Sequence, residues 1–168
     1  MRKAILGGLI LAGPVLASLA ACSPAKAPIA ASSAASYAEA PRHVVSGLPV
    51  IPLTITHAGK KHAFKVEVAG SEAEQEKGLM FRTEMGADEG MIFPMDPPRT
   101  ASFWMRNTVI SLDLVFIGPD HKVLNVAASA VPYDETPLFS AGKASAVLEL
   151  NGGRAAALGI GPGDKVDW

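Results

Sequence analysis

Most of the side chains in this sequence that could do chemistry fall in a single stretch, residues 78–117. The stretch holds five of the six methionines and mixes arginine and aspartate with large apolar residues. A surface loop would carry fewer large apolar groups, and a plain core would carry no arginine or aspartate. We therefore predict that it forms one wall of the core and one wall of a binding pocket. With one residue from a later strand, the candidate pocket residues are Met80, Arg82, Met91, Trp104, Met105, Asn107, Asp113 and Glu149.

Two carboxylates lie inside apolar runs. Asp113 stands among large aliphatic residues, and Glu149 has the same surroundings in its own predicted strand. A buried carboxylate is costly unless it is paired or hydrogen-bonded, so Arg82 and Arg106 are the expected partners. Two interpretations stay open. The charges form a structural ion pair, or they form a pocket in which Arg82 holds an anionic group.

Catalysis by these carboxylates is an alternative function. Asp113 and Glu149 could act as acid and base on an envelope polymer, as paired carboxylates do in glycoside hydrolysis. The chain has no nucleophile elbow, no paired-histidine zinc signature and no phosphate-binding glycine loop. The sequence therefore favours binding over catalysis, with a hydrolase as the alternative.

The methionines suggest a further alternative. Thioether sulfurs are soft ligands that suit Cu(I), and Met80, Met91 and Met105 could converge on one ion. Methionine also fills irregular gaps in cores and packs against aromatic rings such as Trp104. We predict no cofactor and no metal site, and keep a methionine-lined copper site as the third hypothesis. Trp104 and Asn107 suit either a ligand platform or a core tryptophan beside a turn.

The N-terminus has the features of a secretory leader. Residues 1–21 combine a basic start, an apolar run and small residues before Cys22. The segment Leu19-Ala20-Ala21-Cys22 is similar to a bacterial lipobox, and Cys22 is the only cysteine. We predict a lipoprotein anchored in the bilayer through acylated Cys22 and facing the periplasm. Because Ser23 rather than aspartate follows, the outer membrane is the expected location. An ordinary signal peptide or membrane anchor with an idle cysteine is the alternative.

The remainder divides into a tether and a domain. Residues 22–46 are rich in alanine, serine and proline and lack periodicity, which predicts a flexible tether. Residues 47–168 are predicted to form a single β domain. The formal net charge is −1 and no basic patch is evident, so we expect no nucleic-acid partner.

The sequence of the domain predicts short strands and two short helices. Alternating apolar residues predict a hairpin over 50–68, and Ser71 with Glu74 forms a capping box at the start of a short helix. Asn151 is expected to cap a second short helix. The other predicted strands are 91–93, 101–106, 112–117, 121–127, 146–150 and 165–168.

Several of these pieces together resemble a known family. They are Gly78-Leu79-Met80 with Arg82, Gly90-Met91-Ile92-Phe93, Phe103-Trp104-Met105 with Asn107-Thr108, Leu112-Asp113 with Val115-Phe116, and Val147-Leu148-Glu149 with the glycines that follow. In order and spacing they resemble the domain of unknown function 192 over about residues 52–168. The resemblance implies a small antiparallel β-sandwich or jelly-roll-like barrel with two short helices, and no established activity. Arg106 stands where a lysine is often found, which keeps the charge.

These observations converge on one expectation. The chain is predicted to be an envelope lipoprotein whose β domain binds a small ligand or an envelope protein partner, through the pocket residues given above.

Overall fold

The structure is a computed structural model that describes residue 37 and residues 39–168. The predicted leader, Cys22 and most of the predicted tether lie outside these residues. Within the described part, no helix is both long enough and apolar enough to cross a membrane.

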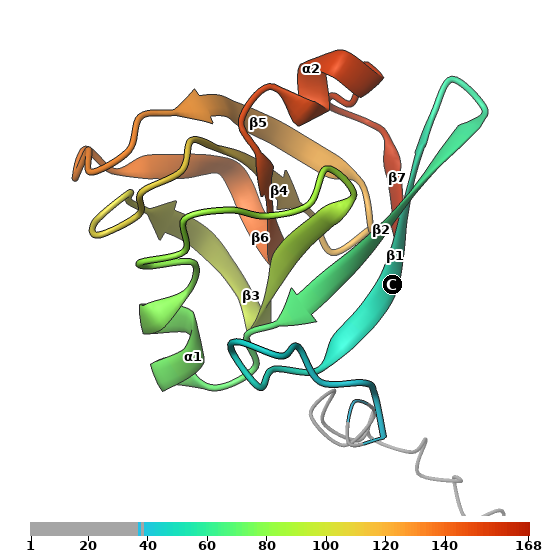
Figure 1. The fold of residues 1–168 in the computed structure, drawn as a ribbon. Coiled ribbons are helices and arrows are strands. Elements are labelled where there is room, and N and C mark those ends of the chain that lie inside the picture. Colours follow the sequence, from blue (N-terminus) through green and yellow to red (C-terminus); the bar gives the residue numbers. More distant parts are fainter. Residues whose placement is uncertain (1–36, 38) are drawn as a thin grey trace, which may run out of the picture. The chain divides into compact units, whose positions relative to one another are not determined.

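The domain is a single seven-stranded sheet that curls on itself (Figure 1). Its spatial order is β5-β4-β6-β3-β2-β1-β7. The two end strands, β5 and β7, lie close to each other where the sheet curls round. The Val123 amide donates to the Asp164 carbonyl at 2.9 Å, and the Val166 amide donates to the His121 carbonyl at 2.8 Å. The predicted mainly β fold with two short helices is confirmed. The bounds are β1 Val50–His57, β2 Lys60–Val68, β3 Glu89–Phe103, β4 Leu112–Ile117, β5 Val123–Ala130, β6 Leu138–Asn151 and β7 Lys165–Asp167, with helices α1 Glu72–Lys77 and α2 Arg154–Leu158.

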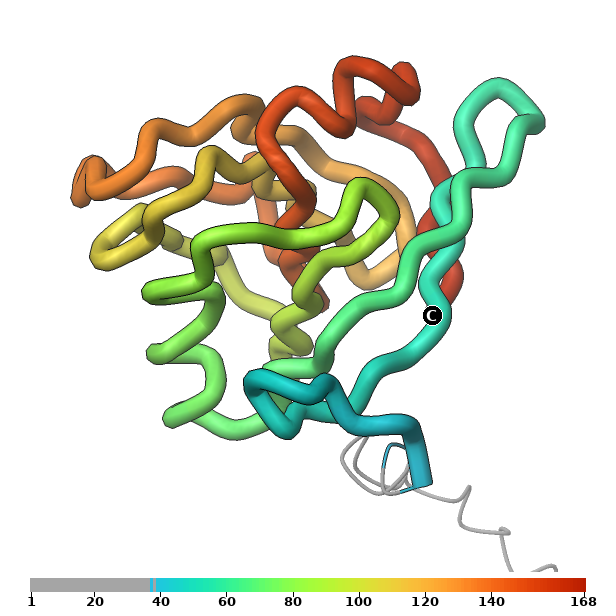
Figure 2. Tube along the Cα trace, viewed as in Figure 1, coloured from blue at the N-terminus to red at the C-terminus, as the bar shows by residue number. Residues whose placement is uncertain are grey.

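One pair of strands departs from the antiparallel arrangement. β2 and β3 run parallel, with Val66 opposite Gly90 and Val68 opposite Ile92. The chain between them contains α1 and a long loop. These carry the chain back along β2, so that β3 begins beside β2 and runs in the same direction, as Figure 2 shows in green. A parallel pair needs such a crossover connection, so the inserted helix explains the difference.

β3 is longer than the sequence indicates. The predicted strands 91–93 and 101–106 belong partly to one strand that continues through the prolines, with a register shift between Pro94 and Arg99. Proline is tolerated at such a bulge because the ladder hydrogen bond is already interrupted there. The strand ends at Phe103, so Trp104, Met105 and Arg106 lie in the loop that follows.

The two helices begin in different ways. At α1 the predicted capping box is confirmed: the Glu74 amide donates to Ser71 Oγ at 3.3 Å, and the Ser71 amide donates to Glu74 Oε2 at 2.8 Å. The expected Asn151 cap of α2 is wrong. The N-cap is Gly153, and Asn151 instead donates its amide to the carbonyls of Met85 and Gly86.

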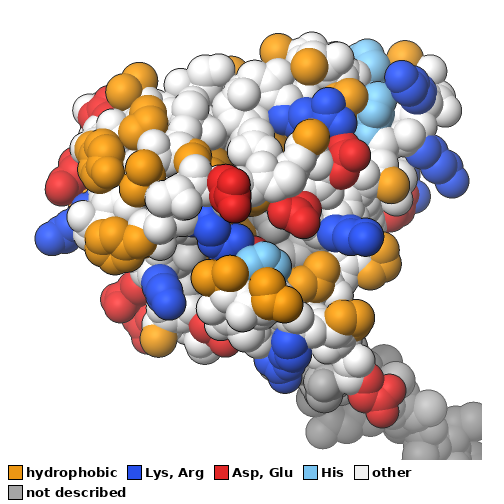
Figure 3. Space-filling view, viewed as in Figure 1, with side chains coloured by type: hydrophobic (Ala, Val, Ile, Leu, Met, Phe, Trp, Pro, Cys, Tyr) orange, Lys and Arg blue, Asp and Glu red, His pale blue; other side chains and the backbone are white. Residues whose placement is uncertain are grey.

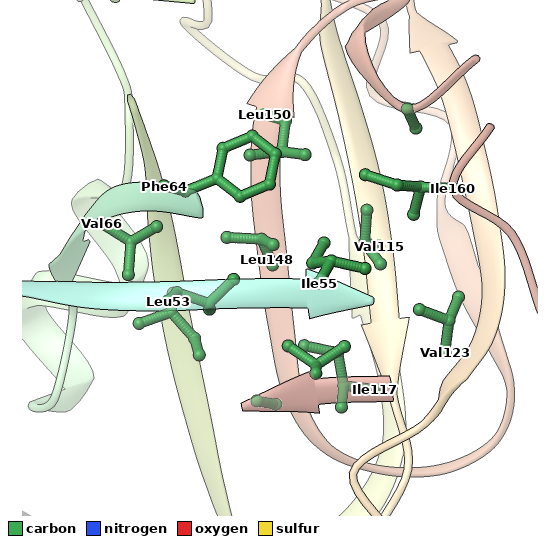
Figure 4. Packing of buried hydrophobic residues seen from close by; sticks show 14 of the residues in the cluster. Leu53, Ile55, Phe64, Val66, Val115, Ile117, Val123, Leu148, Leu150 and Ile160 are labelled. Carbon is green, nitrogen blue, oxygen red and sulfur yellow. The ribbon is translucent and has the colours of Figure 1, made fainter. Parts of the chain in front are cut away.

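The core consists of two clusters on opposite faces of β3, β4 and β6. Figure 4 shows the first, inside the curl of the sheet, where Leu53, Phe64, Val115, Leu148 and Ile160 point toward one another. The second cluster lies on the other face and is covered by residues from loops. Its members include Met91, Phe93, Leu114, Phe116 and Val147, with Leu79 and Met105 over them. The second cluster forms the floor next to the candidate site.

Candidate functional site

A groove of about 700 Å³ lies between α1 with the turn that follows it and the segment 99–108. Four of the eight predicted pocket residues line it, namely Met80, Trp104, Asn107 and Glu149. Phe93, Met95 and Phe103 give it apolar walls, and Arg99 and Arg106 add positive charge. The groove is large enough for a drug-sized molecule.

Glu149 lies at the base of this groove and is only 5% exposed. Its position on β6 is opposite Met91 of β3 and Leu114 of β4, so its side chain shares their face of the sheet. Among the residues that the structure describes, no group donates a hydrogen bond to its carboxyl oxygens. Burial raises the pKa of Glu149 to about 8. At neutral pH the carboxyl is therefore mostly protonated, and it can donate a hydrogen bond into the groove.

Strained backbone lies at Asn107 on the rim of the groove and at Phe81 next to it. Phe81 and Asn107 both have positive φ, 63° and 54°. The Phe81 amide donates to the Asn107 carbonyl at 2.9 Å, and Asn107 Nδ2 lies 3.8 Å from the Met80 sulfur. Non-glycine residues in this region cost free energy, so the surrounding structure must hold them there. These contacts fix the turn after α1 against the loop after β3.

Trp104 stands on the same rim and is 48% exposed. The guanidinium carbon of Arg106 lies 5.5 Å from the centroid of its ring, within the range of a cation–π contact. A half-exposed tryptophan under an arginine offers an apolar surface beside a positive charge, and both line the groove.

Asp113 does not reach the groove. It is fully buried and accepts three backbone amides, from Ser129 at 2.7 Å, Gly153 at 2.9 Å and Ala155 at 2.7 Å. It therefore caps α2 from a neighbouring strand and ties that helix to β5.

Asp113 and Glu149 also lie on opposite faces of the sheet. Leu114 is paired with Glu149, whereas Asp113 is paired with Leu150, which belongs to the cluster inside the curl. Side chains alternate along a strand, so the two carboxyls point away from each other. This arrangement does not favour the alternative in which the two carboxyls act as acid and base on one substrate.

Arg82 has a different partner from those expected. Its guanidinium pairs with Glu67 of β2, with Nη1 3.0 Å from Oε1 and Nη2 3.1 Å from Oε2. The Ser46 hydroxyl donates to the same carboxylate. Arg82 lines a second hollow of about 1020 Å³, which also contains residues 43–46 and Phe81. The predicted pairing of Arg82 with Asp113 or Glu149 is wrong, because the Arg82 guanidinium is paired with Glu67 of β2.

The three methionines proposed as copper ligands have different surroundings. Met91 and Met105 are buried in the second cluster and are absent from the groove lining, whereas Met80 is half-buried and lines the groove. Two of them therefore serve packing, as thioethers commonly do. In the described region, no group of three or more His, Cys, Asp or Glu side chains is arranged to hold a metal ion.

With this geometry established, comparison with known proteins identifies the family. The model of DUF192, described as an uncharacterized ACR, matches residues 53–168. The chain belongs to the DUF192 family. The matched range contains all eight predicted pocket residues, and no curated protein matches the chain.

Two solved structures are similar to this DUF192 domain. One is a protein of unknown function from Novosphingobium aromaticivorans DSM 12444, with 60% identity and a TM-score of 0.75, covering 80% of this chain and 96% of that one. The other, described as a candidate transcription regulator from Sinorhizobium meliloti 1021, has 35% identity and a TM-score of 0.70. It covers 71% of this chain and 94% of that one.

The groove and pairing residues of the DUF192 domain that the sequence did not single out include Glu67, Phe93 and Arg99. Glu67 alternates with apolar residues on β2 and so reads as solvent-facing, although it is only 4% exposed. Phe93 reads as ordinary core. Arg99 had one available signal, since it is the lone base in a proline-rich segment between two predicted strands.

Removing Arg82 should destabilise the DUF192 domain. Arg82→Ala leaves the buried Glu67 carboxylate with the Ser46 hydroxyl and with His43, whose Nδ1 lies 3.6 Å from Glu67 Oε2, so we expect a loss of about 2–3 kcal/mol, below the full cost of breaking a buried pair. Urea unfolding of Arg82→Ala, Glu67→Gln and the double variant measures the coupling between the two. Lys165→Ala is the matched control, because its pair with Asp167 is exposed. Equal effects of Arg82→Ala and Lys165→Ala would contradict the pairing.

Proposed function

We propose that this DUF192 domain binds a small molecule in the groove, with Glu149 as the polar group at its base. One observation supports this most directly: Glu149 is buried in a mainly apolar wall, without a hydrogen-bonding partner in the described part of the chain, and it borders an open groove. An unpaired buried carboxyl costs stability. Such a cost is typical of a group that is kept for a ligand.

A binding role accounts for the arrangement better than catalysis does. The groove contains no second buried carboxyl, because Asp113 lies on the other face of the sheet and is saturated by backbone amides. The lining does contain the usual parts of a binding site, namely aromatic and thioether walls with a few convergent polar groups.

A protein partner is the second candidate, and the exposed apolar residues favour it. Phe81, Trp104, Val131, Tyr133 and Phe139 are all about half exposed or more. The Tyr133 amide donates to the carbonyls of Met105 and Thr108, which places the loop after β5 beside the loop that carries Trp104. Figure 3 shows hydrophobic side chains gathered on the left side of the domain, where these loops lie in Figure 1.

The cellular location of the protein is also proposed from its sequence. We infer that the protein is an envelope lipoprotein anchored through acylated Cys22, on the grounds of the apolar leader and the lipobox-like residues before the only cysteine. The Sinorhizobium meliloti protein is described as a candidate transcription regulator, but a net charge of −1 does not favour binding of this chain to DNA.

Native mass spectrometry of the full chain, purified gently from its own host, tests the proposal. We expect an excess mass that is retained in the native spectrum and lost on denaturation. A covalent lipid on Cys22 would survive denaturation, so the two spectra separate the anchor from the groove ligand.

Variants link the excess mass to the groove. Glu149→Leu should abolish it, since leucine offers no hydrogen bond at the base. Glu84→Gln should retain it, because Glu84 is an exposed carboxylate that lines the second hollow and not the groove. A bare native mass for the unmodified chain, or an excess mass that Glu149→Leu leaves unchanged, would contradict binding in the groove.

A further inference from the structure

The groove is richer in positive charge than the chain as a whole. Its charged lining residues around Glu149 are Glu72, Glu76 and Lys77 from α1, Arg99 from β3 and Arg106 from the following loop. With Glu149 included the lining holds three acids and three bases, so the bases outnumber the ionised acids when buried Glu149 is protonated, whereas the chain as a whole has a net charge of −1. Of the two arginines, Arg99 has no carboxylate within salt-bridge distance in the described region. Arg106 has only Glu135, at 4.0 Å, with both side chains more than half exposed.

The polar groups at the base and rim can donate hydrogen bonds. Both guanidinium groups are donors only, and the protonated carboxyl of Glu149 supplies an O–H. Arginine forks match the geometry of carboxylate and phosphate groups, which carry several acceptor oxygens. A ligand group rich in acceptors and carrying negative charge would therefore be complementary to this part of the groove.

The rest of the lining combines uncharged polar residues, Gln75, Thr100, Ser102, Asn107 and Thr108, with large apolar side chains. Met80, Phe93, Met95, Phe103 and Trp104 all line the groove, and Trp104 presents nearly half of its surface. Phe93 and Met95 are already buried, so a small inorganic anion would leave the exposed parts of Met80, Phe103 and Trp104 uncovered. An apolar chain or ring attached to the anionic group would bury them and gain the corresponding hydrophobic free energy.

We infer that the groove binds an amphipathic anion: a carboxylate or phosphate head held by Arg99 and Arg106 next to Glu149, with an apolar body against Trp104 and the other apolar side chains. This rests on the proposed function and specifies the chemical class of its ligand. A free alkyl carboxylate and a lipid phosphate share this chemistry, and the experiment separates them.

The test uses four probes with the same alkyl chain and different heads. Decanoate and decyl phosphate are the anionic probes, decanol is neutral and decyltrimethylammonium is cationic. Trp168 stacks on His121, and neither lines the groove, so Trp168→Phe in the full chain leaves Trp104 as the single tryptophan reporter at the groove. Fluorescence of Trp104 locates binding, and isothermal titration calorimetry gives the affinity.

We expect one or both anionic probes to bind at least about tenfold more tightly than decanol and decyltrimethylammonium. The stronger of the two anionic probes identifies the source as carboxylate or phosphate. Arg99→Gln and Arg106→Gln should each weaken anion binding by about three- to tenfold. Lys61→Gln, an exposed lysine at the β1–β2 turn, should leave it unchanged.

Measuring the affinity at different pH values tests whether the bound head group contacts Glu149. The affinity for decanoate should fall by about tenfold between about pH 6 and pH 9, because ionised Glu149 would repel the head. Glu149→Gln should remove this dependence, as an amide does not titrate. Glu72 and Glu76 are the other acids that line the groove, and both are exposed on α1.

The outcomes separate the two proposals. Equal or tighter binding of decanol or the ammonium probe, with a change in Trp104 emission, would overturn the anionic class and leave binding in the groove intact. Arginine variants that bind decanoate normally would also overturn it. If no probe binds but the native spectrum retains an excess mass, the anionic class fails alone. If no probe binds and the native mass is bare, both proposals fail.

Discussion

Glu149→Gln is expected to make this DUF192 domain more stable at neutral pH. Burial raises the pKa of Glu149 from 4.5 to about 8, so the folded state holds a proton that the unfolded state releases. The stability that this group contributes is fully present below pH 4.5 and is lost as the pH rises toward 8. Each pH unit in that window costs about 1.4 kcal/mol, so the loss at pH 7 is about 3 kcal/mol. Glutamine avoids this loss because it does not titrate.

Urea unfolding of the two proteins across about pH 4 to pH 9 measures this difference. The curves should meet at the acid end, diverge as the pH rises and become parallel above the folded pKa of Glu149. The control is Glu135→Gln, whose exposed carboxyl should give a difference near zero throughout. A pH-independent difference for Glu149→Gln would show that the carboxyl is not held in a desolvating environment.

Stabilisation by Glu149→Gln together with loss of the pH dependence of binding would be informative about Glu149. A residue that lowers stability and is nevertheless required for a ligand fits the usual trade-off at functional sites. If Glu149→Gln stabilised the domain and left native binding and its pH dependence unchanged, the carboxyl would have no role in the groove.

Asp113→Ala is expected to have the largest destabilising effect, about 4 kcal/mol. The substitution leaves the buried amides of Ser129, Gly153 and Ala155 without their acceptor, at roughly 1–3 kcal/mol each, with partial relaxation. It also removes the cap that fixes α2 to β4. The urea midpoint should fall by the corresponding amount, with α2 the first region to lose protection in hydrogen exchange.

Asp113→Asn is the matched variant. Its amide keeps one acceptor oxygen and loses the other, so it should cost about half as much as alanine. Asp120→Ala is the surface control, because Asp120 is exposed and accepts only the Lys122 amide. If Asp113→Ala cost no more than Asp120→Ala, the three hydrogen bonds would not be holding α2.

Local features of this chain follow from the sequence because their causes lie within a few residues. Ser71 and Glu74 are one helical turn apart, so the capping box is readable and is confirmed. Alternation of apolar and polar residues identifies β1 and β2, and a short apolar run identifies β4, which is buried throughout. The order of the quoted motifs also indicated the DUF192 family, which the match over residues 53–168 confirms.

The tertiary structure alone decided which charged groups meet. Alternation assigns each side chain to a face of its own strand, but it does not say which strand lies beside it or in what register. The pairing of β4 with β6 therefore decides that Asp113 and Glu149 point away from each other. The chain that connects the parallel strands β2 and β3 likewise brings Arg82 to Glu67, which lies fifteen residues earlier in the sequence.

The groove itself depends on the same long-range arrangement. Trp104 and Asn107 were identified from their residue types, whereas Arg99 and Phe93 become groove residues only once α1 and its turn are placed across β3. The sequence by itself determined the presence of most strands but not the length of β3 or β6, and it determined the first helix with its cap and the family. The folded sheet determined which carboxyl became a helix cap and which was left at the base of a groove, because register and crossover connections set contacts between residues far apart in the chain.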